Sequence, residues 1–129
     1  MMLSVDANAY RAFVDNDPVF VEAIQSATQL AFPVVVLGEL RAAFRHGTRR
    51  EQNEEILRQI LARRRVTIHE ISQATSVIYA QIWSELRAMG RPIPTNDVWI
   101  AAQCIEHDFA LLTHDDHFRH VPGFRVLPR

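Results

Sequence analysis

The chain contains no lysine: all fourteen of its cationic side chains are arginine, and fifteen acidic residues bring the formal charge to -1 at pH 7. This balance argues against a strongly basic tail for binding nucleic acid. A single cysteine, Cys104, excludes an intrachain disulfide and leaves no second thiolate for a zinc cluster. No run of about 18 apolar residues and no basic start before a long apolar stretch occurs, so we expect a cytoplasmic protein without a membrane span or secretory signal.

The length and composition favour one continuous hydrophobic core. The 129 residues are 48% hydrophobic, which is enough apolar side chain for a single domain spanning residues 1–129. No Gly/Ser linker, internal repeat or low-complexity tract divides the chain, and the turn residues fall at intervals that suit alternating strands and helices.

Short apolar segments between turn residues predict five strands, and amphipathic segments predict the helices between them. Asp17, Ser72 and Thr95 are expected to cap three of these helices. Strands separated by helices favour a parallel, doubly wound sheet of four or five strands with helices on both faces, a three-layer α/β/α architecture. The expected strands are residues 2–5, 30–33, 66–70, 109–114 and 124–127; the expected helices are 7–14, from 18, 34–47, 49–64, 73–89 and from 95.

Acidic residues occur where several of these elements meet the carboxyl edge of the sheet. Asp6 and Asp115 follow the first and fourth strands, which are neighbours in the common strand order 3-2-1-4-5. Asp97 lies in the first turn of its helix, on the face of Ala101 and Cys104 that should point inward. Glu39 comes early in another helix, so we expect all four carboxylates to converge: Asp6, Glu39, Asp97 and Asp115.

Converging carboxylates repel one another and raise their pKa values unless positive charge is supplied. Oxygen ligands alone favour Mg²⁺ or Mn²⁺. Taken singly, Asp6 has a second explanation as a helix cap and Asp97 as a partner of the helix dipole. Glu39 can be an exposed surface residue, and Asp115 or the adjacent Asp116 a loop residue. The mapping of four independent positions to one sheet edge favours the metal site.

These segments resemble a known family, the PIN-domain ribonucleases, and within it the VapC toxins of bacterial toxin-antitoxin systems. The resemblance covers essentially the whole chain and is carried by "VDANAY", "VVVLGEL", "PIPTNDVWIAA" and "LLTHDDHF". It implies metal-binding or catalytic roles for Asp6, Glu39, Asp97 and Asp115, with Asn8 and Thr113 as polar supports. Asp115 is preferred to Asp116 because the family pattern is Thr, any residue, Asp. The chain departs from the family at Ala7, where a threonine is frequent.

The resemblance further implies an Mg²⁺-dependent endoribonuclease, with Mn²⁺ as a second candidate metal. Water activated by the metal would cleave the RNA phosphodiester bond and leave a 5′-phosphate. The implied partners are an RNA substrate, a cognate VapB-like antitoxin whose C-terminal segment occupies a groove, and a second copy of the chain in a homodimer. Arginine pairs and a triplet could form a local basic surface for RNA, with solvated helix faces as the alternative; these arginines are 41, 45, 49, 50 and 63–65.

Other functions remain open at this point. His114, His117 and His120 are spaced by three residues and could hold zinc, although they share nothing with metalloprotease spacing. A receiver-like signalling domain also gathers aspartates and Mg²⁺ at strand ends, but it should offer a late lysine. A catalytically inactive PIN domain that only binds RNA is the third alternative.

Overall fold

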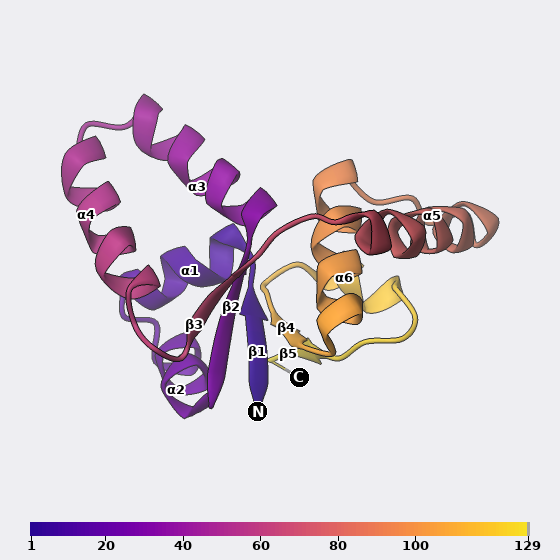
Figure 1. The fold of residues 1–129 in the computed structure, drawn as a ribbon, viewed down its shortest axis with the longest axis horizontal. Helices are drawn as coiled ribbons and strands as arrows, with labels where there is room; N and C mark the ends of the chain where they lie inside the picture. The colour runs from indigo at the N-terminus through magenta and orange to yellow at the C-terminus, as the bar shows by residue number, and fades with distance from the viewer. Residues whose placement is uncertain (129) are drawn as a thin grey trace.

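A five-stranded parallel sheet in the order β3-β2-β1-β4-β5 forms the centre of the protein (Figure 1). The computed structural model describes residues 1–128. The predicted parallel sheet is confirmed, and so is the pairing of the first strand with the fourth. The strands are β1 (Met2–Val5), β2 (Gln29–Pro33), β3 (Val66–His69), β4 (Ala110–Leu112) and β5 (Val126–Leu127).

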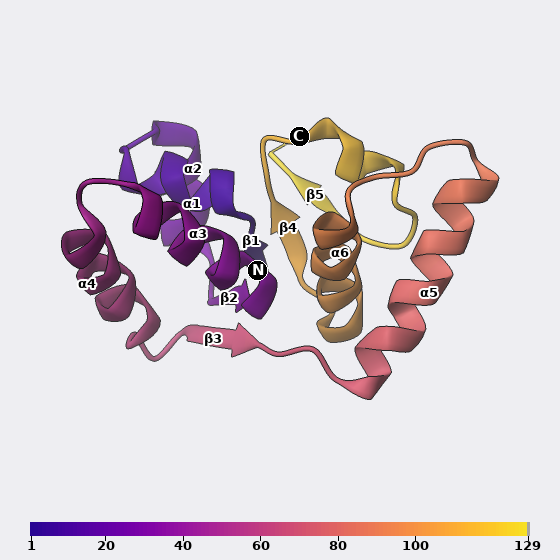
Figure 2. The ribbon, with the colours of Figure 1, turned by 90° about the horizontal axis from the view of Figure 1, so that it is seen from above.

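Helices cover both faces of this sheet. Figure 2 shows α1, α2, α3 and α4 on one side and α5 and α6 on the other, which gives the predicted three layers. Within residues 1–128, no helix combines the length and apolar character needed to cross a bilayer. The helices are α1 (Ala7–Val14), α2 (Pro18–Ser26), α3 (Val34–His46), α4 (Arg50–Leu61), α5 (Gln73–Ala88) and α6 (Thr95–His107), followed by a short 3₁₀ helix, η1 (Asp116–His120).

The central strands are buried because helices pack on both of their faces. Val5 in β1 and Leu111 and Leu112 in β4 have no measurable exposure, and Leu3 retains 1%. Such continuous apolar runs are typical of parallel strands rather than of strands with one wet face. This burial holds β1 and β4 in place, and the side chains of the pocket follow the ends of these two strands.

The register of β1 against β4 determines which side chains meet beyond the sheet. Val5 pairs with Leu112, so that the next residue of each strand, Asp6 and Thr113, leaves the sheet at the same level. The backbone N–H of Asp6 still donates to the carbonyl of Leu112 at 3.4 Å. Two residues that are far apart in the chain therefore become neighbours at the carboxyl edge.

Two of the three predicted helix caps are confirmed. Asp17 accepts a hydrogen bond from the Val19 N–H at 3.1 Å, and Ser72 forms a reciprocal capping box with Thr75. The prediction for Thr95 was wrong. Thr95 is the first residue inside α6. Pro94 occupies the cap position, and no side chain caps this end of the helix.

Candidate functional site

The four predicted carboxylates line one pocket of about 190 Å³ at the carboxyl edge of the sheet. Asp6 immediately follows β1, and Asp115 follows β4 by a short turn. Glu39 projects from α3 and Asp97 from the first turn of α6. The structure therefore brings together all of the acids that the sequence grouped, with Ala7, Asn8 and Arg11 completing the lining.

Asp6 is the most enclosed of these acids, with 5% of its surface exposed. It caps α1, since one carboxylate oxygen accepts from the Ala9 N–H at 2.8 Å. Its other oxygen accepts from the Thr113 hydroxyl. Burial raises the pKa of Asp6, the two hydrogen bonds oppose this rise, and the charges of Asp115 and Asp97 add to it.

Thr113 connects two of the acids. Its buried hydroxyl donates to Asp6 and accepts from the backbone N–H of Asp115 at 2.9 Å. The bond to Asp115 turns the chain back toward the pocket directly after β4. Thr113, which the family resemblance proposed as a polar support, therefore contacts Asp6 and orients the backbone of Asp115.

Asp97 contacts His117, which the sequence analysis did not group with the four acids. Nε2 of His117 is 2.7 Å from Oδ2 of Asp97. Burial raises the pKa of Asp97, His117 opposes this rise, and the nearby charge of Asp115 strengthens it. One oxygen each of Asp97 and Asp115 and one ring nitrogen of His117 all lie within 4.8 Å of one another.

Glu39 completes the acidic pocket from the side of α3. Burial raises the pKa of Glu39, a hydrogen bond from the Asn96 side chain opposes the rise, and the charges of Asp97 and Asp6 reinforce it. Arg11 favours the ionised form of Glu39 through its positive charge. Three acids whose pKa values are all raised, partly by one another, indicate a site with an excess of negative charge.

Asn8 and Arg11 form the rim of the same pocket. The Arg11 guanidinium donates to the Asn8 side-chain carbonyl at 3.0 Å, and Asn8 itself lines the pocket as the sequence predicted. Arg11 was not predicted. Its position four residues after Ala7, the first residue of α1, could have indicated it, because residues four apart lie on one helix face.

The zinc interpretation of the three regularly spaced histidines was wrong. His117 contacts Asp97, whereas the ring of His114 lies on Phe20 with centroids 4.2 Å apart. His120 lies near the Arg91 guanidinium, at 3.3 Å. Among residues 1–128, these three histidines form no common metal-binding group.

The donor set fits a divalent cation. Carboxylate oxygens from Asp6, Glu39, Asp97 and Asp115 face one pocket, and oxygen-rich sites of this kind suit Mg²⁺ or Mn²⁺. A bound cation would offset the mutual repulsion that raises the pKa values of Asp6, Glu39 and Asp97.

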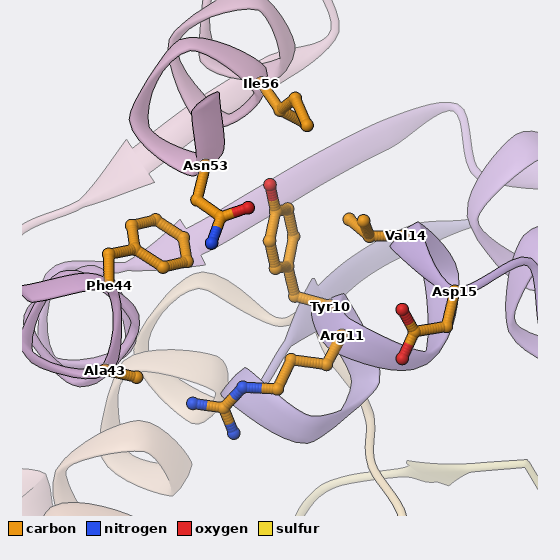
Figure 3. Close-up of a pocket in the computed structure, with 8 residues that line it drawn as sticks. All are labelled: Tyr10, Arg11, Val14, Asp15, Ala43, Phe44, Asn53 and Ile56. Carbon is orange, nitrogen blue, oxygen red and sulfur yellow. The ribbon is translucent and has the colours of Figure 1, made fainter. Parts of the chain in front are cut away.

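A second pocket, of about 260 Å³ and shown in Figure 3, shares Arg11 with the acidic one. It lies between α1, α3 and α4, and Figure 3 shows the Tyr10 ring directed from α1 toward α4. Arg11 lines both pockets and so marks the boundary between them. Phe44, Val14 and Ile56 contribute apolar side chains to the second pocket, beside the polar Arg11, Asp15 and Asn53.

An α/β/α protein with a polar pocket at the carboxyl edge of a parallel sheet belongs to the class of folds that bind ligands where the winding reverses. The PIN domain family matches residues 3–123, and the chain belongs to this family.

The chain is similar to "Ribonuclease VapC4" of Mycobacterium tuberculosis, with 34% identity over 94 residues, which are 73% of this chain and 72% of that protein. It is 27% identical to "Ribonuclease VapC2" of Rickettsia felis over 104 residues, 80% of this chain and 76% of that one. The solved structure of VapBC2 from Rickettsia felis, bound to a DNA fragment from its promoter, matches with a TM-score of 0.85 at 23% identity. That match covers 98% of each chain. The family predicted from the sequence is confirmed.

Proposed function

We propose that this protein is a divalent-metal-dependent endoribonuclease and the toxin of a VapBC-type toxin-antitoxin pair. The proposal is carried by one observation, the convergence of Asp6, Glu39, Asp97 and Asp115 on a single pocket. Membership of the PIN-domain family and similarity to proteins named as VapC ribonucleases support the choice of RNA as substrate. Mg²⁺ is the proposed metal, with Mn²⁺ as the alternative.

The four carboxylates would hold the metal, and Thr113 would keep Asp6 and Asp115 in place for it. A bound divalent cation supplies positive charge to the scissile phosphate and lowers the pKa of water that attacks it. Arg11, held by Asn8 at the rim, is placed to contact a phosphate of the RNA next to the acids. Asn8 and Thr113 thus act as the proposed polar supports.

The expected basic surface contributes less than the arginine count suggests. The Arg41 guanidinium lies 3.3 Å from Glu54, and Arg65 donates to the carbonyls of Ile24 and Ala27 at 2.7 Å. Arg65 therefore joins α2 to the start of β3. These two arginines are engaged within the protein, and we propose Arg11 for the RNA contact because it lines the acidic pocket.

An antitoxin protein is the proposed partner, because structural relatives are VapBC complexes. The pocket shown in Figure 3 offers a partly apolar seat that shares Arg11 with the acidic pocket, and a bound segment there would also block the approach of RNA past Arg11. We further propose that the chain forms a homodimer and that residues 1–129 act as a single PIN domain.

The structure bears differently on the two alternative functions, a receiver-like domain and an inactive PIN domain. A receiver-like domain is excluded by the strand order, because receivers follow 2-1-3-4-5 whereas this sheet runs β3-β2-β1-β4-β5. A catalytically inactive PIN domain that binds RNA would share the fold and the family. It differs from the proposal only in chemistry, and cleavage assays separate the two.

The test is cleavage of labelled total RNA by the purified chain with Mg²⁺ or with EDTA. We expect Asp97→Asn to lower the cleavage rate by at least about 100-fold, because it removes a carboxylate from the pocket. Asp116→Asn is the matched control, since the Asp116 side chain is 92% exposed. Cleavage that survives both EDTA and Asp97→Asn would refute the mechanism, and intact RNA under all conditions would favour the inactive binding module.

A further inference from the structure

His117 borders the acidic pocket through its contact with Asp97, although neither the family resemblance nor the sequence pattern assigned it to the acids. Its Nε2 atom approaches Asp97 to 2.7 Å. A potential ligand atom of Asp115 completes a group whose members all lie within 4.8 Å of one another. This group contains a nitrogen donor, which distinguishes it from a purely acidic cluster.

The spacing suits one ion. Ligand atoms about 2.1 Å from a divalent cation are about 3 Å apart when they are adjacent and about 4.2 Å apart when they are opposite. The separation of 2.7 Å between His117 and Asp97 and the limit of 4.8 Å for the whole group are close to these values. Small side-chain movements would therefore place all three atoms around one cation, once the proton that Nε2 of His117 shares with Asp97 is released to solvent.

The position of His117 follows from buried anchors on both sides of it. Asp115 is tied to Thr113 by its backbone N–H, and the Phe118 side chain is fully buried. Between these anchors, the His117 side chain is 36% exposed, so that its ring lies at the surface rather than in the core. The chain thus holds a ring nitrogen against Asp97 at the edge of the pocket.

Among residues 1–128, Asp6 is not part of the group of ligand atoms that all lie within 4.8 Å of one another. Both of its carboxylate oxygens already accept hydrogen bonds, one from Ala9 and one from Thr113. Asp97 and Asp115 instead each have an oxygen within 4.8 Å of a ring nitrogen of His117. The donors that are nearest to one another are consequently two carboxylates and one imidazole.

With the proposed metal-dependent function as its basis, we infer that Nε2 of His117 is a ligand of the cation together with Asp97 and Asp115, and that it makes the site select Mn²⁺ over Mg²⁺. Imidazole is a softer donor than carboxylate and binds first-row transition metals well. Mg²⁺ prefers an all-oxygen octahedron and keeps several of its waters. A nitrogen ligand therefore strengthens binding of Mn²⁺ more than binding of Mg²⁺.

Pulsed electron paramagnetic resonance of the unmodified chain loaded with Mn²⁺ tests this ligand directly. We expect the ¹⁴N modulation of a coordinated imidazole, its loss in His117→Gln and its retention in His114→Gln. His114 is a matched control because it flanks Asp115 on the other side and its ring lies on Phe20. Absence of the modulation from the unmodified chain, or its survival in His117→Gln, would overturn the inference.

Calorimetric titration with Mn²⁺ and Mg²⁺ gives the second readout. We expect His117→Gln to weaken Mn²⁺ binding by at least about tenfold, with little change for Mg²⁺. His117→Asp supplies an oxygen in place of the nitrogen, so it should bind both metals but discriminate between them less. Equal loss of Mn²⁺ binding in His114→Gln and His117→Gln would instead indicate an unspecific effect on the loop and refute the assignment.

These readouts separate the inference from the proposed function. The nitrogen signal and the ratio of the Mn²⁺ and Mg²⁺ dissociation constants do not depend on whether RNA is cleaved. A chain that shows the signal without cleaving RNA retains the His117 ligand but contradicts the nuclease proposal. A chain that cleaves RNA without the signal retains the nuclease and contradicts the ligand.

Discussion

Replacement of Asp115 by asparagine should make the metal-free protein more stable. The substitution preserves the size of the side chain and removes one negative charge from the pocket. The charge of Asp115 helps to raise the pKa values of both Asp6 and Asp97, so its removal relieves repulsion at one buried and one half-buried acid. Within residues 1–128 its carboxylate accepts no hydrogen bond, so the change costs no such bond.

The size of the effect follows from the separation of the charges. Oxygens of Asp97 and Asp115 lie within 4.8 Å of each other. At this distance two unit charges repel by about 3.5 kcal/mol at an effective dielectric constant of 20 and by about 0.9 kcal/mol in bulk water. Both side chains are partly exposed, which places the expected gain in unfolding free energy at about 1 to 3 kcal/mol.

The gain should depend on pH in a defined direction. Because the folded-state pKa values of Asp6 and Asp97 are raised, the native protein binds more protons than the unfolded chain between the ordinary and the raised values. The loss of unfolding free energy that the charged acids cause is therefore complete above the raised pKa values. It is relieved as the pH falls through those values and the acids are protonated. The advantage of Asp115→Asn should shrink over the same interval, since protonated neighbours no longer repel Asp115.

Urea denaturation in EDTA at neutral pH measures the difference, with Asp116→Asn as the control. The control should change stability by no more than about 0.5 kcal/mol, because Asp116 is exposed. Added Mg²⁺ or Mn²⁺ should stabilise the unmodified chain more than Asp115→Asn. A variant less stable than the parent in EDTA, or one stabilised equally by metal, would refute the argument that Asp115 belongs to a repulsive, metal-binding group.

Two further predictions concern buried polar side chains. Thr113→Val should destabilise the protein by about 1.5 to 3 kcal/mol, because the Asp6 carboxylate loses a buried donor. Thr113→Ser keeps the hydroxyl and should lose about 1 kcal/mol for the missing methyl group; equal losses in urea denaturation would contradict the hydrogen-bond argument. Burial holds the pKa of His69 at about 4, below its ordinary 6.5. The unfolding free energy carries no penalty from His69 above pH 6.5, where the ring is neutral in both states. It falls by about 3 kcal/mol as the pH drops to 4, because the unfolded chain takes up a proton on His69 first. His69→Phe should flatten the stability profile in this interval, and an unchanged slope would assign the acid sensitivity to other groups.

The fold was predictable because its signals are local. Short, mainly apolar segments such as Met2–Val5 and Ala110–Leu112 are recognisable as buried parallel strands from residue type. The topology rules for parallel sheets then place the ends of these strands at one edge. The acids that directly follow a strand or begin a helix could accordingly be grouped before the structure was known.

The neighbours of those acids were harder to predict. His114 and His117 lie on either side of Asp115 in the sequence, yet only His117 reaches Asp97. The direction of each ring depends on how η1 turns after Asp115 and on the burial of Phe118. No periodic pattern in so short a segment encodes that turn.

The sequence by itself determined the alternation of strands and helices, the family and the four acidic positions, because each depends on residue type and spacing within a short window. Tertiary structure alone decided that the hydroxyl of Thr113 meets Asp6, 107 positions away, and that a histidine nitrogen joins Asp97 and Asp115. Such contacts depend on the packing of the whole core, which sets distances between elements to within an ångström. Local patterns carry no information at that precision, and metal ligation depends on it.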